Sequence, residues 1–148
     1  MGTPCRIGIR NENGSISSIR CNYDGYIKKG VGEDLFKHYK TKEKILELLK
    51  LGDLSRLGTE PVDNPKAWET CTTGEYEKYH PNNTCDTYKS RGENCPAKVS
   101  SNLTEFFKLA NESWCDYRYL YEDGVWGLVY YSEDDEELYF LPVETYLL

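Results

Sequence analysis

Two stretches of the chain combine rings, cations and carboxylates in a way that suits a phosphorylated small molecule. They are CNYDGY at 21–26 and TYKSRGE at 87–93. Tyrosine rings stack on a nucleobase or a ribose, basic side chains hold phosphate, and carboxylates accept hydrogen bonds from ribose hydroxyls. The predicted ligand-binding residues are Tyr23, Asp24, Tyr26, Lys89, Arg91 and Glu93. The alternative is that Asp24 and Gly25 form a β-turn while the tyrosines pack against neighbouring helices.

Metal binding has one candidate set, which consists of Cys71, His80, Cys85 and Cys95. Thiolates and an imidazole are good zinc ligands. However, the stretch lacks the paired C-x-x-C spacing that is typical of zinc sites, and unpaired thiols are the alternative. We therefore predict no metal and no cofactor, and keep these four residues as the candidate zinc ligands.

The sequence gives no support to catalysis. It contains two histidines, His38 and His80, and none of the common hydrolase, kinase or metalloprotease motifs. We predict that the protein is not an enzyme. A hydrolase that uses carboxylates around a metal is the alternative, although no pairing of carboxylates follows from their spacing.

Charge is concentrated at the C-terminal end of this acidic chain, whose net charge is −7. Residues 111–148 contain one basic and ten acidic side chains. Bulk duplex nucleic acid needs a cationic surface and is therefore excluded as a partner. The run SEDDEE could instead cover a basic groove on a protein, and the predicted partner-binding residues are Glu133, Asp134, Asp135, Glu136 and Glu137.

The predicted ligand-binding stretch CNYDGY follows a predicted hairpin. RIGIRNENGSISSIRC alternates apolar and polar residues around Asn13-Gly14, a dipeptide typical of tight turns. A two-residue loop would place Ile9 opposite Ser18. We favour a three-residue or bulged loop, which pairs Ile9 with Ile19 and Ile7 with Cys21 on one apolar face.

Helices are expected after this hairpin. The spacing of apolar residues predicts a helix pair over 33–51, with Thr41 as a cap and Gly52 as the end of the second helix. A short third helix is predicted at 100–112. Between them, residues 57–98 read as an irregular, loop-rich stretch around one short strand at 84–90.

The C-terminal part predicts a three-stranded meander. An Asp123-Gly124 turn places Tyr121 opposite Trp126, and the strand LYFLPV follows the acidic loop. The predicted fold class is α+β, an antiparallel sheet made of the hairpin and the meander, with the helix pair and the third helix packed on it. We expect residues 1–148 to form a single domain.

No apolar run is long enough for a membrane span, and MGTPCRIGIR lacks the apolar core of a signal peptide. We therefore expect a cytoplasmic protein that does not bind membranes.

Several motifs together resemble a family of small, mostly uncharacterised proteins of phages and prophages. They are RIGIRNENGSISSIRCNYDGY, LGDLSRLG, TYKSRGE and YRYLYEDGVWGLVYYSEDDEELYFL, within residues 5–57, 86–93 and 115–141. The chain departs from the family pattern in having Asn22-Tyr23 in place of His-Trp and Lys89 in place of His. The Cys-rich loop is not part of the resemblance.

The resemblance implies a viral accessory protein of an infected bacterial host. Such proteins often oppose host defence by stoichiometric binding, so we expect a counter-defence protein that sequesters a nucleotide-derived immune signal. A homo-oligomer that builds its ligand pockets across subunit interfaces would bind such a signal more tightly. The alternative is an anti-CRISPR-like inhibitor that binds a defence effector through its acidic C-terminal region.

Overall fold

The computed structural model describes residues 2–64 and 83–148. The strands are β1 (Cys5–Arg10), β2 (Ile16–Cys21), β3 (Leu54–Arg56), β4 (Asp86–Thr87), β5 (Lys98–Ser100), β6 (Tyr117–Glu122), β7 (Val125–Ser132) and β8 (Glu137–Pro142). The α-helices are α1 (Val31–His38), α2 (Lys42–Lys50) and α5 (Leu103–Glu112), and the 3-10 helices are η1 (Lys89–Arg91) and η2 (Val143–Tyr146). The α+β class predicted from the sequence is confirmed.

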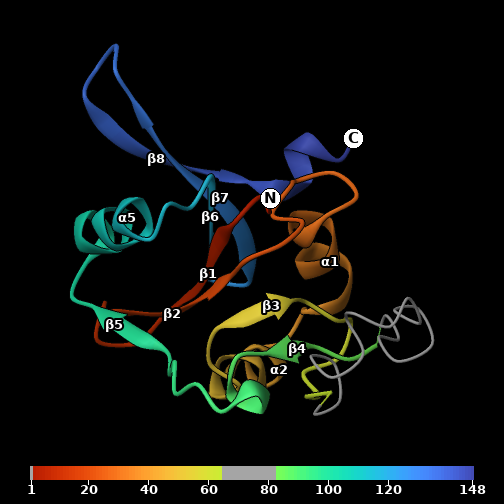
Figure 1. Ribbon diagram of the computed structural model, residues 1–148. Helices are drawn as coiled ribbons and strands as arrows, with labels where there is room; N and C mark the ends of the chain where they lie inside the picture. The colour runs from red at the N-terminus through yellow and green to blue at the C-terminus, as the bar shows by residue number, and fades with distance from the viewer. Residues whose placement is uncertain (1, 65–82) are drawn as a thin grey trace.

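The described strands form one sheet in the order β4, β3, β2, β1, β6, β7, β8, with β5 paired to β2. The N-terminal hairpin and the C-terminal meander meet at its centre, where β1 lies beside β6 (Figure 1). The prediction of a wholly antiparallel sheet was wrong, because β1 and β6 run parallel, as do β2 and β3. Parallel neighbours need a long crossover, and the helix pair between β2 and β3 is such a connection.

The register of the first hairpin also differs from the prediction. Cys5 lies opposite Cys21 and Ile7 opposite Ile19, so the loop spans residues 11–15. The side chain of Asn13 accepts hydrogen bonds from both the amide and the hydroxyl of Ser15, which stabilises this longer loop. The same side chains still lie on one apolar face. The observed register differs from the predicted one by two residues, and side chains along a strand alternate with a period of two.

The C-terminal hairpin follows the prediction more closely. Tyr121 lies opposite Trp126 and Tyr119 opposite Leu128. Asp123 and Gly124 both have positive φ, at 50° and 80°, as a two-residue hairpin turn of this type requires. The strand β8 completes the meander.

The three helices lie where the apolar spacing placed them. Thr41 caps α2 by accepting a hydrogen bond from the amide of Lys44, and Gly52 follows the helix with a φ of 75°. Asn102 caps α5 in the same way, through the amide of Glu105. The predicted strand at 84–90 is limited to β4, and the RGE motif begins at the end of the 3-10 helix η1 rather than in a strand.

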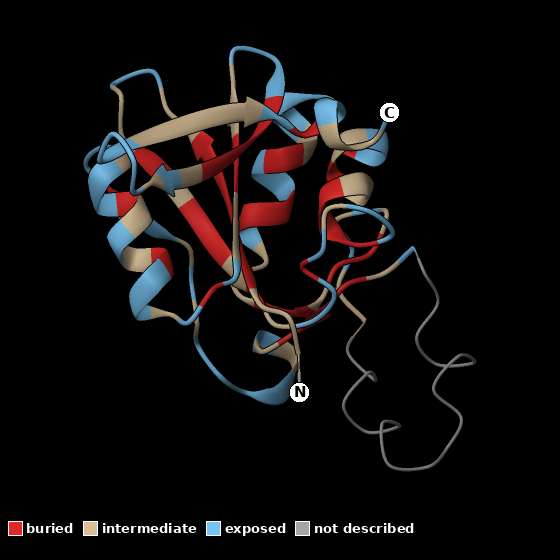
Figure 2. Ribbon diagram, turned by 90° about the horizontal axis from the view of Figure 1, so that it is seen from above, coloured by how far each residue is buried: buried red, intermediate tan, exposed pale blue. Residues whose placement is uncertain are grey.

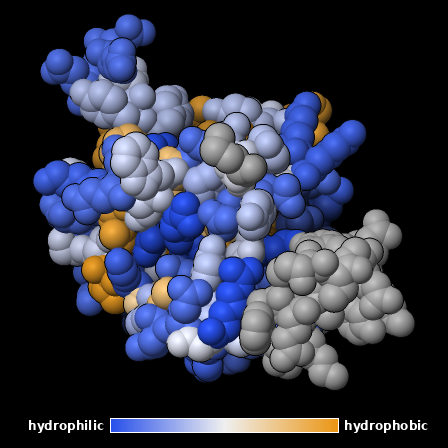
Figure 3. Space-filling model, in the orientation of Figure 1, coloured by the Kyte–Doolittle hydropathy of each residue, from blue (hydrophilic) through white to orange (hydrophobic). Residues whose placement is uncertain are grey.

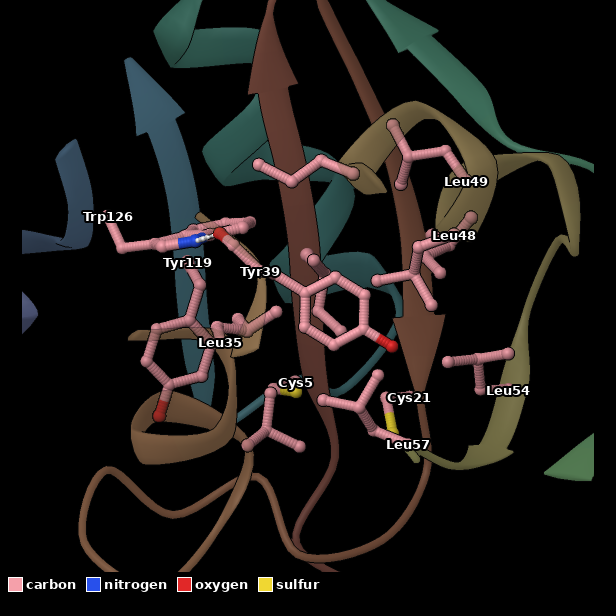
Figure 4. Packing of buried hydrophobic residues seen from close by; sticks show 14 of the residues in the cluster. Cys5, Cys21, Leu35, Tyr39, Leu48, Leu49, Leu54, Leu57, Tyr119 and Trp126 are labelled. Atoms are coloured by element: carbon pink, nitrogen blue, oxygen red, sulfur yellow. Dashed lines mark hydrogen bonds between the residues drawn. The ribbon is translucent and has the colours of Figure 1, made fainter. Parts of the chain in front are cut away.

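Helices cover both faces of the sheet, and buried residues lie between the layers (Figure 2). The larger core joins α1 and α2 to the sheet, and Figure 4 shows Leu35, Leu48 and Tyr39 converging on it. The smaller core lies under α5 and consists of Ile16, Phe106, Leu120 and Val129, with Leu103, Phe107 and Phe140 packed around it.

Candidate functional site

The loop after β2 is held in place by backbone contacts from three directions. The amide of Tyr23 donates to the carbonyl of Ser55 in β3, and the amide of Gly25 donates to the carbonyl of Thr3. The buried hydroxyl of Tyr119 donates to the Gly25 carbonyl at 2.7 Å. A side chain at Gly25 would lie 2.4 Å from the Thr3 carbonyl oxygen, so only glycine fits here. The loop is therefore a fixed platform for its neighbouring side chains.

The same loop closes the N-terminus of α1. The amides of Val31, Gly32 and Glu33 donate to carbonyls of residues 24, 26 and 27 at 2.7 to 3.0 Å. Free amides at a helix N-terminus commonly bind anions, but these three are already occupied. Any anion bound nearby must therefore be held by side chains.

A cleft of about 400 Å³ opens between this loop, α1 and β3. Its lining combines an aromatic ring, carboxylates and cationic or titratable side chains. The lining residues are Tyr23, Asp24, Lys29, Gly30, Val31, Asp34, His38, Arg56, Leu57 and Thr59. Its volume lies within the range of about 300–1,000 Å³ for small-molecule sites, and its polar lining favours a polar ligand.

Asp34 and His38 lie one turn apart on the cleft side of α1. Partial burial raises the pKa of Asp34, an effect that the charge of Asp24 adds to and that of His38 opposes. Raised carboxyl pKa values are common in ligand sites, because burial that disfavours charge also strengthens hydrogen bonds to a ligand.

Arg56 enters the cleft from β3 and is positioned by its neighbours. Its Nε lies 3.3 Å from a carboxylate oxygen of Asp86, and its Nη2 donates to the Thr84 carbonyl at 3.4 Å. Lys29 reaches the cleft from the loop, where its φ is 57°. Together these two residues place positive charge at the rim.

Of the six predicted ligand-binding residues, two line this cleft, Tyr23 and Asp24. Tyr23 has 44% of its surface exposed, whereas Tyr26, at 49%, is not among the lining residues. Lys89, Arg91 and Glu93 lie around η1, outside this lining, and all three are exposed.

The residues around η1 form a surface next to the cleft. The Arg91 guanidinium stacks over the Tyr88 ring at 5.0 Å. Burial raises the pKa of the Tyr88 phenol, and the charges of Arg91 and Arg20 oppose that rise. The ligand-binding role of Arg91 stays a prediction.

Five polar cleft residues were not among the predicted ligand-binding residues: Lys29, Asp34, His38, Arg56 and Thr59. The spacing of Asp34 and His38 was a usable signal, because residues four apart share one face of a helix. Arg56 carried no such signal, since its proximity to Tyr23 depends on the pairing of β2 with β3.

Two of the four candidate zinc ligands, Cys71 and His80, lie outside the described residues. Cys85 is fully buried, where its sulfur accepts a hydrogen bond from the Gly58 amide at 3.2 Å. Burial raises the pKa of Cys85 to about 11, which disfavours the thiolate that zinc needs. Within residues 2–64 and 83–148, His, Cys, Asp and Glu form no group of three or more that could hold a metal ion.

Four of the predicted partner-binding residues form the turn between β7 and β8, Glu137 begins β8, and all five are exposed. This hairpin extends away from the body of the protein, and its tip is strongly hydrophilic (Figures 1 and 3). The Tyr139 hydroxyl donates to Asp135, which lowers the pKa of that carboxyl and raises the pKa of Tyr139 to about 12. The tip is therefore anionic at neutral pH.

Comparisons with protein-family models, curated proteins and solved structures find no match for this chain. The resemblance to the phage and prophage family therefore stays a prediction. Across residues 2–64 and 83–148, every helix is too short or too polar to span a lipid bilayer.

Proposed function

We propose that this chain is a phage-encoded counter-defence protein that binds a nucleotide-derived immune signal stoichiometrically and so inhibits host antiviral immunity. The observation that carries the proposal is the cleft beside α1, where Tyr23, Lys29 and Asp34 bring a ring, a cation and a carboxylate together. A nucleotide offers a partner for each of them. The phage origin rests on the sequence resemblance alone.

Each cleft residue has a role in this proposal that follows from its chemistry. Tyr23 stacks on the base or the ribose, and Lys29 and Arg56 bind phosphate. Asp24 and Asp34 accept hydrogen bonds from ribose hydroxyls. Because the amides at the start of α1 are already occupied, phosphate affinity depends on the two cationic side chains, and salt weakens binding.

The test is calorimetry with a panel of cyclic nucleotides and ADP-ribose-type molecules. We expect a ligand with a Kd below about 10 μM, which corresponds to a binding free energy of about 7 kcal/mol. Denaturing the complex should return the ligand intact, since no turnover is proposed. A panel without any such binder would remove the proposal, and a chemically changed ligand would favour the hydrolase instead.

A pair of variants locates the binding site. Tyr23→Ala should weaken binding at least about tenfold, or about 1.4 kcal/mol, because it removes the stacking ring. Arg91→Ala is the matched control: this residue lies outside the cleft lining, so its removal should change the Kd less than about twofold. An equal loss in both variants would move the site to the surface around Tyr88.

The second candidate is an anti-CRISPR-like inhibitor that binds a defence effector through residues 133–137. The exposure of all five acidic side chains at the tip of an extended hairpin favours it. Acidic groups there can replace phosphates in a basic groove, and such binding weakens with salt. Reversal of the five charges should abolish inhibition if this candidate holds, and inhibition that survives the reversal would dismiss it.

A further inference from the structure

Three arginines form a row across the centre of the sheet. Arg6 on β1 lies opposite Arg20 on β2 and also opposite Arg118 on β6, and these strands lie side by side in Figure 1. Directly opposed residues on neighbouring strands project from the same face. Like charges in such positions are destabilising. The arrangement is unexpected in a protein with a net charge of −7.

The row has no carboxylate partner in contact. Within residues 2–64 and 83–148, no acidic oxygen lies within 4.0 Å of any of the three guanidinium groups. By contrast, Arg10 binds Glu122 at 2.9 Å and Arg56 lies 3.3 Å from Asp86. The nearest carboxylates are Asp53, which accepts a hydrogen bond from the backbone amide of Arg20 at 2.9 Å and acts electrostatically on Arg6, and Asp116, which acts on Arg118.

Neutral groups hold the guanidiniums instead. Arg6 donates to the hydroxyl and the carbonyl of Ser18 at 2.8 and 3.3 Å. Arg20 donates to the carbonyl of Ser113 at 2.9 Å and to the side chain of Asn22 at 3.2 Å. These contacts fix the orientation of the two side chains but supply no negative charge.

Arg118 is held in a similar way. It donates to the side chain of Asn111 at 2.6 Å and lies over the ring of Phe107 at 4.4 Å. Its Nε is buried and has no hydrogen-bond partner. One donor of the row is therefore left without an acceptor.

Burial makes this uncompensated charge costly. Arg6 has 2% of its surface exposed, and a buried charge is expensive unless a counter-charge accompanies it. The thiol of Cys115 interacts electrostatically with all three arginines. However, burial raises the pKa of Cys115, so the neutral thiol provides no counter-charge at neutral pH.

Solvent reaches both ends of the row. Arg20 and Arg118 are half-buried; Phe107 and Asn111 of α5 contact Arg118, whereas Arg20 is contacted by Ser113, just after the helix. Trp114, next to the Ser113 carbonyl that binds Arg20, has 84% of its surface exposed. A small ligand can therefore approach Arg20 and Arg118 while Arg6 adds its charge from below.

We propose that the arginine row, formed by Arg6, Arg20 and Arg118, binds a phosphate-type oxyanion at this surface. The planar guanidinium fork matches phosphate oxygens and binds them through paired, charge-assisted hydrogen bonds. A polyvalent anion such as pyrophosphate suits three adjacent cations better than a monovalent one does. The site is separate from the cleft beside α1, which none of the three arginines lines.

Titration with inorganic phosphate and with pyrophosphate tests this proposal, at a constant ionic strength set with chloride. We expect pyrophosphate to bind by calorimetry and to raise the thermal midpoint, whereas an equal ionic strength of chloride alone does not. The Arg20→Gln/Arg118→Gln variant should bind pyrophosphate at least about tenfold more weakly, because it removes both accessible guanidiniums. Lys37→Gln, which removes an exposed charge of α1 on the other face of the sheet, should keep the affinity within about twofold.

Three outcomes would overturn the site: no pyrophosphate binding to the wild type, unchanged affinity in the double variant, or an equal loss in Lys37→Gln. If the double variant does not fold, the single variant Arg20→Gln replaces it with the same expectation of weaker binding. Lys29→Gln, which removes a phosphate-binding cation of the cleft, should leave pyrophosphate affinity unchanged, which separates this site from the cleft. ADP then tests whether the bound phosphate can belong to a nucleotide. If ADP competes with pyrophosphate, the phosphates of ADP bind at the arginine row.

Discussion

The two faces of the sheet differ in how fully their buried polar groups are paired. On the face covered by α1 and α2, the buried Tyr119 hydroxyl donates to Gly25 and the Trp126 indole donates to the Tyr39 carbonyl at 2.8 Å, a hydrogen bond drawn in Figure 4. On the other face, α5 covers a small apolar core and contacts Arg118 at one end of the arginine row. A closed face requires every polar atom to be satisfied, whereas a face left open at one end can keep charge for a ligand.

Truncation of a buried leucine in the larger core gives the largest expected effect. Leu48→Ala should lower the free energy of unfolding by about 2–5 kcal/mol, because it removes buried apolar surface and leaves a cavity. Leu46→Ala on the same helix, where 37% of the side chain is exposed, is the control and should cost less than about 1 kcal/mol. Chemical denaturation measures both, and equal losses would mean that α2 does not pack as described.

Loss of the buried Tyr119 hydroxyl should have the second largest effect on stability. Tyr119→Phe should cost about 1–3 kcal/mol, since it leaves the Gly25 carbonyl without its side-chain donor in a buried place. The cleft loop begins at this contact, so amide hydrogen exchange in residues 22–30 should rise as well. Tyr131→Phe alters an exposed tyrosine and serves as the control, and a loss of similar size there would contradict the role of burial.

Removal of the buried Arg6 charge tests the face of the sheet that α5 covers. The double variant Arg6→Met/Ser18→Ala, in buffer without phosphate, should keep the free energy of unfolding within about 1 kcal/mol of the wild type or raise it. The reason is that the variant removes a buried cation without a counter-ion, together with the serine that binds it. A loss above about 3 kcal/mol would show that the arginine is needed for folding itself.

The smallest effect concerns Asp34 and pH. Because burial raises the pKa of Asp34 in the folded protein, the folded state binds this proton more tightly than the unfolded chain. Its contribution to stability is therefore complete at low pH and is lost as the pH rises from the ordinary carboxyl pKa of 3.8 through the raised value. Asp34→Asn should remove this dependence and stabilise the protein at pH 7 by at most about 0.5 kcal/mol. Thermal midpoints of both proteins across this pH range measure the difference, and parallel curves would contradict it.

Local sequence patterns predicted the parts of the fold that depend on neighbours in the chain. The spacing of Leu35, Leu48 and Leu49 predicted helices, and Asp123-Gly124 predicted a hairpin turn with the observed pairing. The first hairpin was predicted in the wrong register, because Asn13 binds Ser15 and so lengthens the loop. A side-chain hydrogen bond of this kind is not visible in an alternation of apolar residues.

The sequence by itself thus determined the helices, the C-terminal hairpin and the presence of Tyr23 and Asp24 at a turn. Only the tertiary structure decided that Arg56 joins them in the cleft rather than Arg91, and that Arg6, Arg20 and Arg118 stand in one row. The physical reason is that periodicity records which way each side chain points along its own strand or helix. The neighbour across a sheet depends instead on how distant strands pair, and that is settled by the packing of the whole chain.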